Sequence, residues 1–410
     1  MATACRFCGA PLTRTFVDLG TTPLANSYLA PTPEAIAAER AYPLHVMVCD
    51  VCRLVQVEEA VPADAVFAAD YAYLSSYSES WLAHCERYAD AMIARFGLGS
   101  TSLVVEIASN DGYLLRFFKA RGVPVLGIEP AAHAAEIARA QGIATEVMFF
   151  NGITAPALAA RGVAADLMPA NNVFAHVPDI RGFIAGFPSV LTLGGVVTFE
   201  FPHLLNLIRG VQFDTIYHEH YSYLSLLVAE RVLASAGLRV FDVEELPTHG
   251  GSLRVFACHG PAGYGETEGL AKVRADEAAA GLDSAAGYEG FAAKVEAVKQ
   301  GFRAFLADAR AAGKTVAAYG AAAKGNTFLN VCGATAEDIA FVVDRNPEKQ
   351  GKLLPGSHVP VHAPAALYGR KPDYVLILPW NLTAEIRSLY GDIEAWGGRF
   401  VTAVPEIRIY

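Results

Sequence analysis

The stretch VVEIASNDGYLL, residues Val104–Leu115, decides the fold of this chain. A short apolar strand leads into a polar turn and then into a helical segment, and such a unit opens a doubly wound α/β sheet. Glu106 lies at the end of the strand, and Ala108, Asn110 and Gly112 lie in the turn. Ligands of these sheets bind outside the carboxyl ends of the strands, so we expect these four residues to contact a cofactor. Only one of the expected glycines is present, so an ordinary strand-to-helix turn is the alternative.

Strand ends further along the chain extend this candidate cofactor site. Glu129 ends the next strand, in VLGIEP, where a carboxylate can accept hydrogen bonds from both ribose hydroxyls of an adenosine-type cofactor. Asn151 follows the third strand, in FFNG, and Asn171 and Asn172 follow the fourth, in PANNVFAHVPD. Amides at these positions suit the adenine edge or the rest of such a cofactor, so we predict that these residues bind it.

Strands and helices continue to alternate as far as GGVVTFEF, which predicts an open parallel sheet with helices on both faces. LRVFDVEEL and GSLRVFACHG add two strands that suit an antiparallel edge pair. These segments predict a central domain over residues 86–260. An Ala- and Glu-rich connector helix ending near Gly313 leads to a second, smaller, Rossmann-like α/β pattern, so we assign residues 261–410 to a C-terminal domain.

The first 85 residues contain two pairs of closely spaced cysteines. Cys5 and Cys8 form one C-x-x-C knuckle, and Cys49 and Cys52 form the other. Four thiolates with no open position are typical of a structural zinc site, so we predict a small zinc-binding domain over residues 1–85. A redox pair is the alternative. Loop-like stretches such as DLGTTPLANSYLAPTP and an aromatic run, DYAYLSSYSESW, complete this segment, and the other cysteines are expected to be core thiols: Cys85, Cys258 and Cys332.

Composition excludes several classes of function. The chain has 410 residues, of which 32 are basic and 42 acidic, and the net charge of −10 disfavours binding to nucleic acid. No apolar run is long enough to span a membrane and no signal peptide is evident, so we expect a cytoplasmic protein with no membrane partner. An odd number of cysteines, seven, does not suit a disulfide framework.

The segment DTIYHEHYSYLS is the densest chemical cluster of the sequence. It contains Tyr217, Glu219 and His220, a combination in which imidazole can remove a proton, a carboxylate can orient it and a phenol can donate to a developing oxyanion. His218 and His220 could instead belong to a second metal site, and the cluster could also be purely structural. His176, at the end of an apolar stretch, would by itself be a structural histidine.

In combination, these motifs resemble the sugar C-methyltransferases of deoxysugar biosynthesis, which are enzymes of antibiotic pathways. The resemblance covers essentially the whole chain and rests on the cysteine knuckles together with EIASNDGYLL, NNVFAHVPD, QFDTIYHEHYSYLS, HGGSLRVF, GAAAKGNTFLN and DRNPEKQGKLLPG. It implies a zinc domain, an S-adenosylmethionine domain and a C-terminal Rossmann-like domain. The implied activity is methylation, at C3, of a dTDP-linked 4-keto-deoxysugar, with a histidine as base.

The resemblance also implies roles for individual residues. His220, Glu219 and Tyr217 fall in the catalytic segment, His176 falls in NNVFAHVPD, and Tyr71 falls in the aromatic run. The substrate-binding residues that we expect are Tyr73, Lys324 and Asn326, with Lys324 as a phosphate contact. Which of the neighbouring tyrosines at 71, 73 and 77 faces the substrate stays open.

Two other functions are compatible with parts of the sequence. The first is an NAD-dependent nucleotide-sugar epimerase or oxidoreductase that uses the C-terminal domain, although YGAAAKGNT lacks the G-x-G-x-x-G spacing. The second is a non-enzymatic zinc-ribbon adaptor, which would leave Glu129 and the Tyr, His and Glu cluster without a role. The sequence leaves open the sugar substituents, including an amine at the methylated carbon, the face of attack and the oligomeric state, with a monomer among the options.

Overall fold

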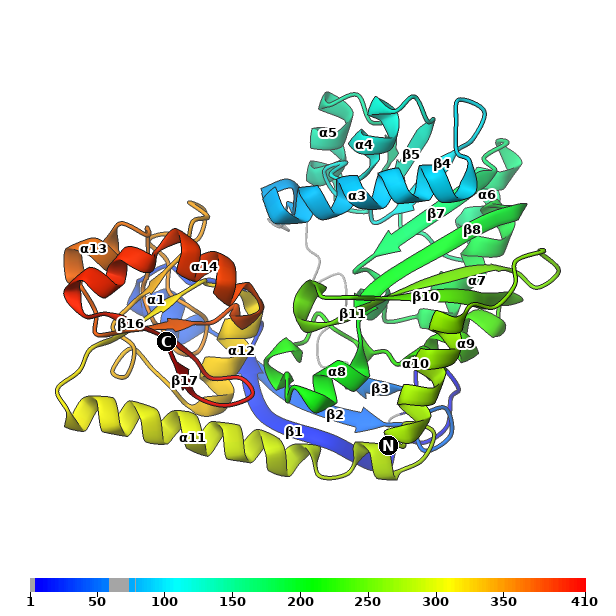
Figure 1. Ribbon diagram of the computed structural model, residues 1–410. Helices are drawn as coiled ribbons and strands as arrows, with labels where there is room; N and C mark the ends of the chain where they lie inside the picture. The colour runs from blue at the N-terminus through cyan, green and yellow to red at the C-terminus, as the bar shows by residue number, and fades with distance from the viewer. Residues whose placement is uncertain (1–3, 59–73, 78) are drawn as a thin grey trace.

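A computed structural model describes residues 4–58, 74–77 and 79–410. Three β-sheets organise these residues, and each occupies its own part of the molecule (Figure 1). Tyr71 and Tyr73, two of the predicted substrate-facing residues, lie outside the described ranges. Within those ranges, no helix is long and apolar enough to cross a membrane.

The first sheet is antiparallel, in the order β1-β2-β3-β9. Its elements are β1 (Arg14–Pro23), α1 (Pro33–Ala38), β2 (Ala41–Val48), β3 (Val55–Val57) and β9 (Ser222–Tyr223). The loop-like interpretation of DLGTTP was wrong, because these residues complete β1 and a register irregularity between Asp18 and Thr21 accommodates Gly20 at a φ of 78°. Strand β9 comes from the His-rich segment, so that segment is built into the N-terminal sheet.

The second sheet has seven strands, in the order β10-β11-β8-β7-β4-β5-β6. Its strands are β4 (Val104–Ile107), β5 (Val125–Ile128), β6 (Thr145–Glu146), β7 (Ala165–Asn171), β8 (Leu191–Pro202), β10 (Leu238–Leu246) and β11 (Ser252–His259). Its helices are α3 (Glu79–Phe96), α4 (Leu115–Ala120), α5 (Ala132–Ala140), α6 (Ala155–Ala160), α7 (Ile180–Val190), α8 (Leu204–Arg209) and α9 (Leu226–Ala234). The pairings of β4 to β8 are parallel and β10 pairs with β11 at the antiparallel edge, which confirms both predictions.

The topology of this sheet determines where a ligand can bind. The chain builds β4, β5 and β6 outward in one direction and then returns to place β7 on the other side of β4. The strand order therefore reverses between β4 and β7, and open α/β sheets bind ligands outside the carboxyl ends of the strands at such a reversal. Helix α3 crosses this region and buries Cys85 and Tyr88 against the sheet, so residues on either side of position 85 pack with the central domain.

The third sheet has six strands, in the order β14-β13-β12-β15-β16-β17, and only the last pair is antiparallel. Its strands are β12 (Val316–Tyr319), β13 (Val342–Val343), β14 (Val361–His362), β15 (Tyr374–Ile377), β16 (Arg399–Thr402) and β17 (Arg408–Ile409). Its helices are α12 (Ala323–Cys332), α13 (Ala366–Arg370) and α14 (Thr383–Leu389). A second Rossmann-like α/β unit is thus present, with its own strand reversal between β12 and β15.

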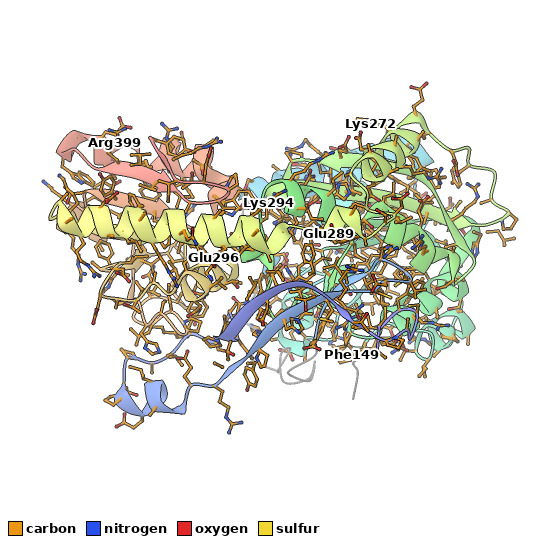
Figure 2. The ribbon with its side chains drawn as sticks, turned by 90° about the horizontal axis from the view of Figure 1, so that it is seen from below. Phe149, Lys272, Glu289, Lys294, Glu296 and Arg399 are labelled. Carbon is orange, nitrogen blue, oxygen red and sulfur yellow. The ribbon has the colours of Figure 1, made fainter. Side chains whose placement is uncertain are left out.

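The connector consists of two helices, where the sequence predicted one. Helix α10 (Glu268–Ala279) packs beside β10, and only α11 (Phe291–Ala311) runs to the C-terminal sheet, as Figure 2 shows. The break falls where Gly281 and Gly290 adopt positive φ values of 75° and 76°, which interrupt a helix. Phe291 stacks on Phe16 of β1 at 4.5 Å, so α11 joins the N-terminal sheet and the C-terminal domain in one hydrophobic core.

Candidate active site

The four cysteines of the two knuckles meet at one point. Their sulfur atoms all lie within 4.8 Å of one another, and the Cys5–Cys52 and Cys8–Cys49 pairs are 3.5 Å apart. A tetrahedral zinc with bonds of about 2.3 Å places its sulfurs at about this separation. Gln56 donates from Nε2 to Cys5 Sγ at 3.2 Å and orients that ligand. The cluster fits a closed, structural zinc site. Cys85, Cys258 and Cys332 are buried core thiols, as predicted.

The turn after β4 has the geometry of a glycine-rich loop although it contains a single glycine. Ala108, Asn110 and Gly112 all have positive φ values, of 57°, 48° and 77°. Asn tolerates this left-handed region, whereas Ala carries backbone strain there, and such strain concentrates at functional sites. The departure from the usual glycine pattern in the sequence therefore does not alter the shape of the turn.

Glu129, which directly follows β5, bonds to this turn. Its Oε2 accepts a hydrogen bond from the Asn110 backbone N–H and its Oε1 accepts one from Ala131, both at 2.8 Å. Burial raises the pKa of Glu129 and, further inside the sheet, raises that of Glu106 well above its ordinary value. Glu129 lies at the surface of the turn and is 5% exposed, whereas Glu106 is completely buried behind it. Of the two, Glu129 is therefore the one placed to reach a ligand.

Two unsatisfied side chains mark the end of β7. Within the described chain, the side-chain oxygens of Asn171 and Asn172 are buried and accept no hydrogen bond, and Asn172 has a φ of 53°. Buried polar atoms are rarely left unpaired, so polar groups of a bound ligand at the strand reversal would satisfy them. Asn151 differs, because its side chain accepts the backbone N–H groups of Ile153 and Thr154 and shapes the turn before α6. Its predicted contact with the cofactor stays a prediction.

The segment before α3 bonds to the turn after β4, which the sequence did not indicate. The short helix η1 (Ser75–Tyr77) donates from the Ser75 N–H to Asn110 Oδ1 at 2.9 Å and from the Ser76 N–H to Asp111 Oδ2 at 3.3 Å. These bonds bring the end of the aromatic run to the cofactor side of the central sheet.

Three of the predicted catalytic residues, His176, Tyr217 and His220, lie together. The ring of His220 is 4.6 Å from that of His176 and 4.0 Å from that of Tyr217, measured between centroids. His176 comes from the short helix η2 (Phe174–His176) after β7, whereas Tyr217 and His220 precede β9. The end of the central sheet and the entry to the N-terminal sheet thus converge on one cluster. His218 points elsewhere, with its Nε2 3.1 Å from the Pro43 carbonyl, and the cysteine cluster is the one group of possible metal ligands in the described chain.

Backbone carbonyls fix the tautomers of both histidines. His220 Nδ1 is 2.8 Å from the Thr215 carbonyl oxygen, and His176 Nδ1 is 2.9 Å from that of Glu219. Since a carbonyl only accepts, each Nδ1 carries a proton and each Nε2 of the neutral ring is left as an acceptor. Burial lowers the pKa of His220 well below its ordinary value and lowers that of His176 to about 4. Both rings are therefore neutral near pH 7 and can accept a proton at Nε2.

Glu219 precedes His220 in the chain, and its backbone carbonyl is the partner of His176 Nδ1. It is 5% exposed, and burial raises its pKa to about 7. Its Oε1 accepts a hydrogen bond of 2.7 Å from Asn26 Nδ2, although 193 residues separate the two in sequence. The sequence analysis did not single out Asn26, and no local pattern points to it.

The C-terminal domain brings Lys324 to the same region. Its Nζ donates to Asn381 Oδ1 at 2.7 Å and lies 4.7 Å from the ring centroid of Trp380. Trp380 donates from Nε1 to buried Asp214, whose pKa burial raises to about 6. Burial lowers the pKa of Lys324, and its charge acts on His220. Asn326, by contrast, is completely buried and donates to the Ala25 carbonyl, so its predicted contact with substrate stays a prediction.

His249 is a second residue that the sequence analysis did not single out. It has a φ of 55° in the short helix η4 (Thr248–Gly250), and its ring is 5.6 Å from that of Trp81 on α3. Burial lowers its pKa to about 4. The HGG motif was visible in the sequence, but without the fold it indicated only a turn.

Comparison with known proteins agrees with this architecture. Three family models match in order: a zinc binding domain over residues 5–67, a methyltransferase domain over 81–243 and a C-methyltransferase C-terminal domain over 247–405. The chain belongs to this family of C-methyltransferases, and it is an S-adenosylmethionine-dependent methyltransferase with a structural zinc. It is 36% identical to the C-methyltransferase NovU of Streptomyces niveus over 405 residues, which cover 99% of this chain and 96% of NovU.

Solved structures resemble only part of the chain. A methyltransferase from Clostridium acetobutylicum is 12% identical, with a TM-score of 0.36, over 48% of this chain and 96% of its own. Magnesium protoporphyrin IX methyltransferase from Synechocystis PCC 6803 is 14% identical, with a TM-score of 0.32, over 44% of this chain and 82% of its own.

Proposed function

We propose that the protein methylates C3 of a dTDP-linked 4-keto-deoxysugar, and that His220 removes the proton from that carbon. The observation that carries this proposal is the neutral, buried His220 ring, whose Nδ1–H is occupied by a carbonyl while its Nε2 is available to accept a proton. The resemblance of the motifs to sugar C-methyltransferases supports the choice of substrate. When bound, S-adenosylmethionine supplies a methyl group on a positively charged sulfur.

Methylation at carbon needs a base because a saturated carbon is not a nucleophile. Removal of a proton next to a ketone gives an enolate, and the negative charge then lies largely on the former ketone oxygen. His220 Nε2 takes the proton and becomes cationic, and the Glu219 carboxylate, in its ionised form, stabilises that charge. Glu219 and His220 are adjacent residues with different partners, because the Asn26 side chain bonds to Glu219 and the Thr215 carbonyl bonds to His220.

The tautomers distinguish the residues that can stabilise the enolate. A neutral His176 with its proton on Nδ1 presents only an acceptor at Nε2, so in this state it cannot donate to the ketone oxygen. The Tyr217 hydroxyl is a donor and lies in the same ring cluster. We therefore assign oxyanion stabilisation to Tyr217, with Tyr71 as a further candidate. His176 serves to pack against the base.

The two strand reversals accommodate the two ligands of such a reaction. Glu129, Asn171 and Asn172 lie at the reversal of the central sheet and suit S-adenosylmethionine, with Glu129 on its ribose. Lys324 lies in the first turn of α12, directly after β12, where a cation and helix N–H groups favour a diphosphate. The nucleotide part of the substrate is therefore assigned to the C-terminal domain.

The test uses dTDP-linked 4-keto-deoxysugars, with and without an amine at C3, and S-adenosylmethionine carrying a ¹³C-labelled methyl group. We expect NMR of the product to show the label bonded to C3. A label on oxygen or nitrogen would overturn the proposed chemistry, and label on another carbon would overturn the position. Thermal shift with S-adenosylmethionine and with NAD in parallel separates methyl transfer from the epimerase alternative, which requires stabilisation by NAD.

A further inference from the structure

The turn after β1 joins the C-terminal domain to the buried carboxylate of Glu219. At residues 24–28 the chain reverses, with the Ser27 N–H bonded to the Leu24 carbonyl and the Tyr28 N–H bonded to that of Asn26. The Asn26 side chain leaves this turn, is exposed, and donates to Glu219 Oε1 at 2.7 Å. Glu219 itself is 5% exposed, so this bond joins an exposed amide to a buried carboxylate.

The C-terminal domain anchors the turn on both sides of Asn26. Asn326 of α12 donates to the Ala25 carbonyl at 2.6 Å, and the Tyr28 hydroxyl donates to the Ala321 carbonyl. Leu29 and Leu353 then exchange a pair of backbone hydrogen bonds of 2.9 and 3.1 Å. Ala321 and Asn326 flank Lys324, the residue to which we assigned the diphosphate. The position of Asn26 therefore depends on the position of residues 321–326, to which we assigned the nucleotide.

We propose that Asn26 is a positioning residue that fixes the Glu219 carboxylate through this hydrogen bond and favours its ionised form. This inference rests on the proposed role of Glu219. An amide N–H donates equally well to any carboxylate oxygen, but a hydrogen bond to the charged form is the stronger one. The bond also restricts the Glu219 side chain to one of the conformations that it could otherwise adopt. Asn26 thus acts through Glu219 and needs no contact with the reacting carbon.

The other titratable groups near Glu219 do not account for a transition near neutral pH. Tyr28 faces it from the turn, and burial raises the pKa of Tyr28 far above neutrality. His176 bonds to the Glu219 backbone carbonyl, His218 and His220 flank Glu219 in sequence, and burial lowers the pKa of all three rings. Tyr217 is the remaining neighbour in its own segment. Asp214, at the start of the same segment, has its pKa raised by burial to about 6, so the shift of the transition in a variant of Asn26, which bonds to Glu219, is what assigns it to Glu219.

The decisive experiment follows the pH dependence of kcat in Asn26→Ala, Asn26→Asp and Ser27→Ala. Ser27 is exposed on the same turn, and its hydroxyl makes no hydrogen bond to other described residues, so Ser27→Ala is the matched control. Loss of the amide in Asn26→Ala should move the acid limb of the kcat profile up by about one pH unit. The value of kcat should then fall about tenfold below pH 7 and change little at high pH. The added carboxylate of Asn26→Asp should move it further, and Ser27→Ala should leave it unchanged. A purely structural role predicts equal losses at all pH values, and that result would overturn the proposal.

A second measurement does not require activity. The folded-state pKa of Glu219 lies above its unfolded value, so its contribution to stability is present at low pH and is lost as the pH rises through about 7. The difference in unfolding free energy between the zinc-loaded wild type and Glu219→Gln should level off near pH 7. The same difference in the Asn26→Ala background should level off about one unit higher. If the pH at which the difference levels off does not move, the role of Asn26 is overturned. If it moves but the protein shows no methyl transfer, the proposed function is overturned and Asn26 is retained as the partner of Glu219.

The anchoring of the turn is tested with Tyr28→Phe, which removes the bond to the Ala321 carbonyl and keeps the ring. The acid limb should move in the same direction as in Asn26→Ala, by a smaller amount. An unchanged limb would show that Asn26 positions Glu219 independently of the C-terminal domain and would overturn the coupling.

Discussion

Replacement of His220 by Asn tests the proposed base with little change to its surroundings. In the native protein, the Nδ1–H of His220 donates to the Thr215 carbonyl at 2.8 Å. The amide N–H of an asparagine at position 220 lies at a similar distance from the backbone and can keep that bond, so the segment before β9 should hold its path. What the substitution removes is the Nε2 lone pair, which is the atom that accepts the proton.

The expected loss follows from the role of a general base. Such groups contribute about 10²- to 10⁴-fold to the rate, so kcat of His220→Asn should fall by that factor, which corresponds to about 3–5 kcal/mol. Affinity for S-adenosylmethionine should stay nearly unchanged, because Glu129 and the turn after β4 lie on the central sheet and not in the ring cluster. Exchange of the C3 hydrogen with deuterated water, in the absence of methyl transfer, should slow in parallel if the proton taken up can return to solvent.

His176→Asn is the matched control, because His176 has the same tautomer, is also buried, and lies 4.6 Å away between ring centroids. Steady-state kinetics, calorimetry with the cofactor and NMR of the exchange reaction should be measured on both variants. If His220→Asn keeps near wild-type turnover while His176→Asn abolishes it, His176 is the base and the roles are reversed. Comparable losses of C3 exchange in both variants would contradict a single base.

Two further predictions concern the cofactors. Glu129→Ala should weaken S-adenosylmethionine binding by about 1.5–3 kcal/mol in calorimetry, since hydrogen bonds to a charged group are lost, whereas wild-type affinity in this variant would refute the ribose contact. Cys8→Ser should lose zinc and lower the unfolding temperature, because a structural site couples metal binding to folding. Metal analysis of the active wild-type protein should give one zinc per chain, and well under about half an equivalent would contradict a structural zinc.

The parts of the fold that the sequence predicted are those with a local signal. Apolar strands that end in Glu106 and Glu129 indicated the doubly wound sheet, and two C-x-x-C pairs indicated the zinc site. The turn after β4 gave a weaker signal, since Ala108 and Asn110 occupy positions with φ values of 57° and 48°, where glycine is expected. The conformational propensities of single residues cannot reveal a strained turn whose conformation is determined by tertiary contacts.

Elements that depend on distant partners were the ones that the sequence did not predict. Asp18–Pro23 looked like a loop because Gly, Thr and Pro interrupt it, yet β2 supplies a partner for this segment and makes it a strand. The connector looked like one helix because Ala and Glu favour helix throughout, whereas Gly281 and Gly290 divide it. The bond between Asn26 and Glu219 spans 193 residues and has no periodicity that a sequence could reveal.

The same long-range contacts predict that the proposed chemistry needs all three parts of the chain. The segment that carries Glu219 and His220 ends in β9, which pairs with β3 of the zinc-bearing sheet. Trp380 of the C-terminal domain holds Asp214 at the start of this segment, and Asn26, on a turn anchored to that domain, holds Glu219. Among the described rings of this cluster, His176 is the one that follows a strand of the central sheet. We therefore expect a methyltransferase domain by itself to retain the proposed cofactor site at Glu129 and to lose the position of the proposed base, because contacts from the two other domains hold the segment that carries it.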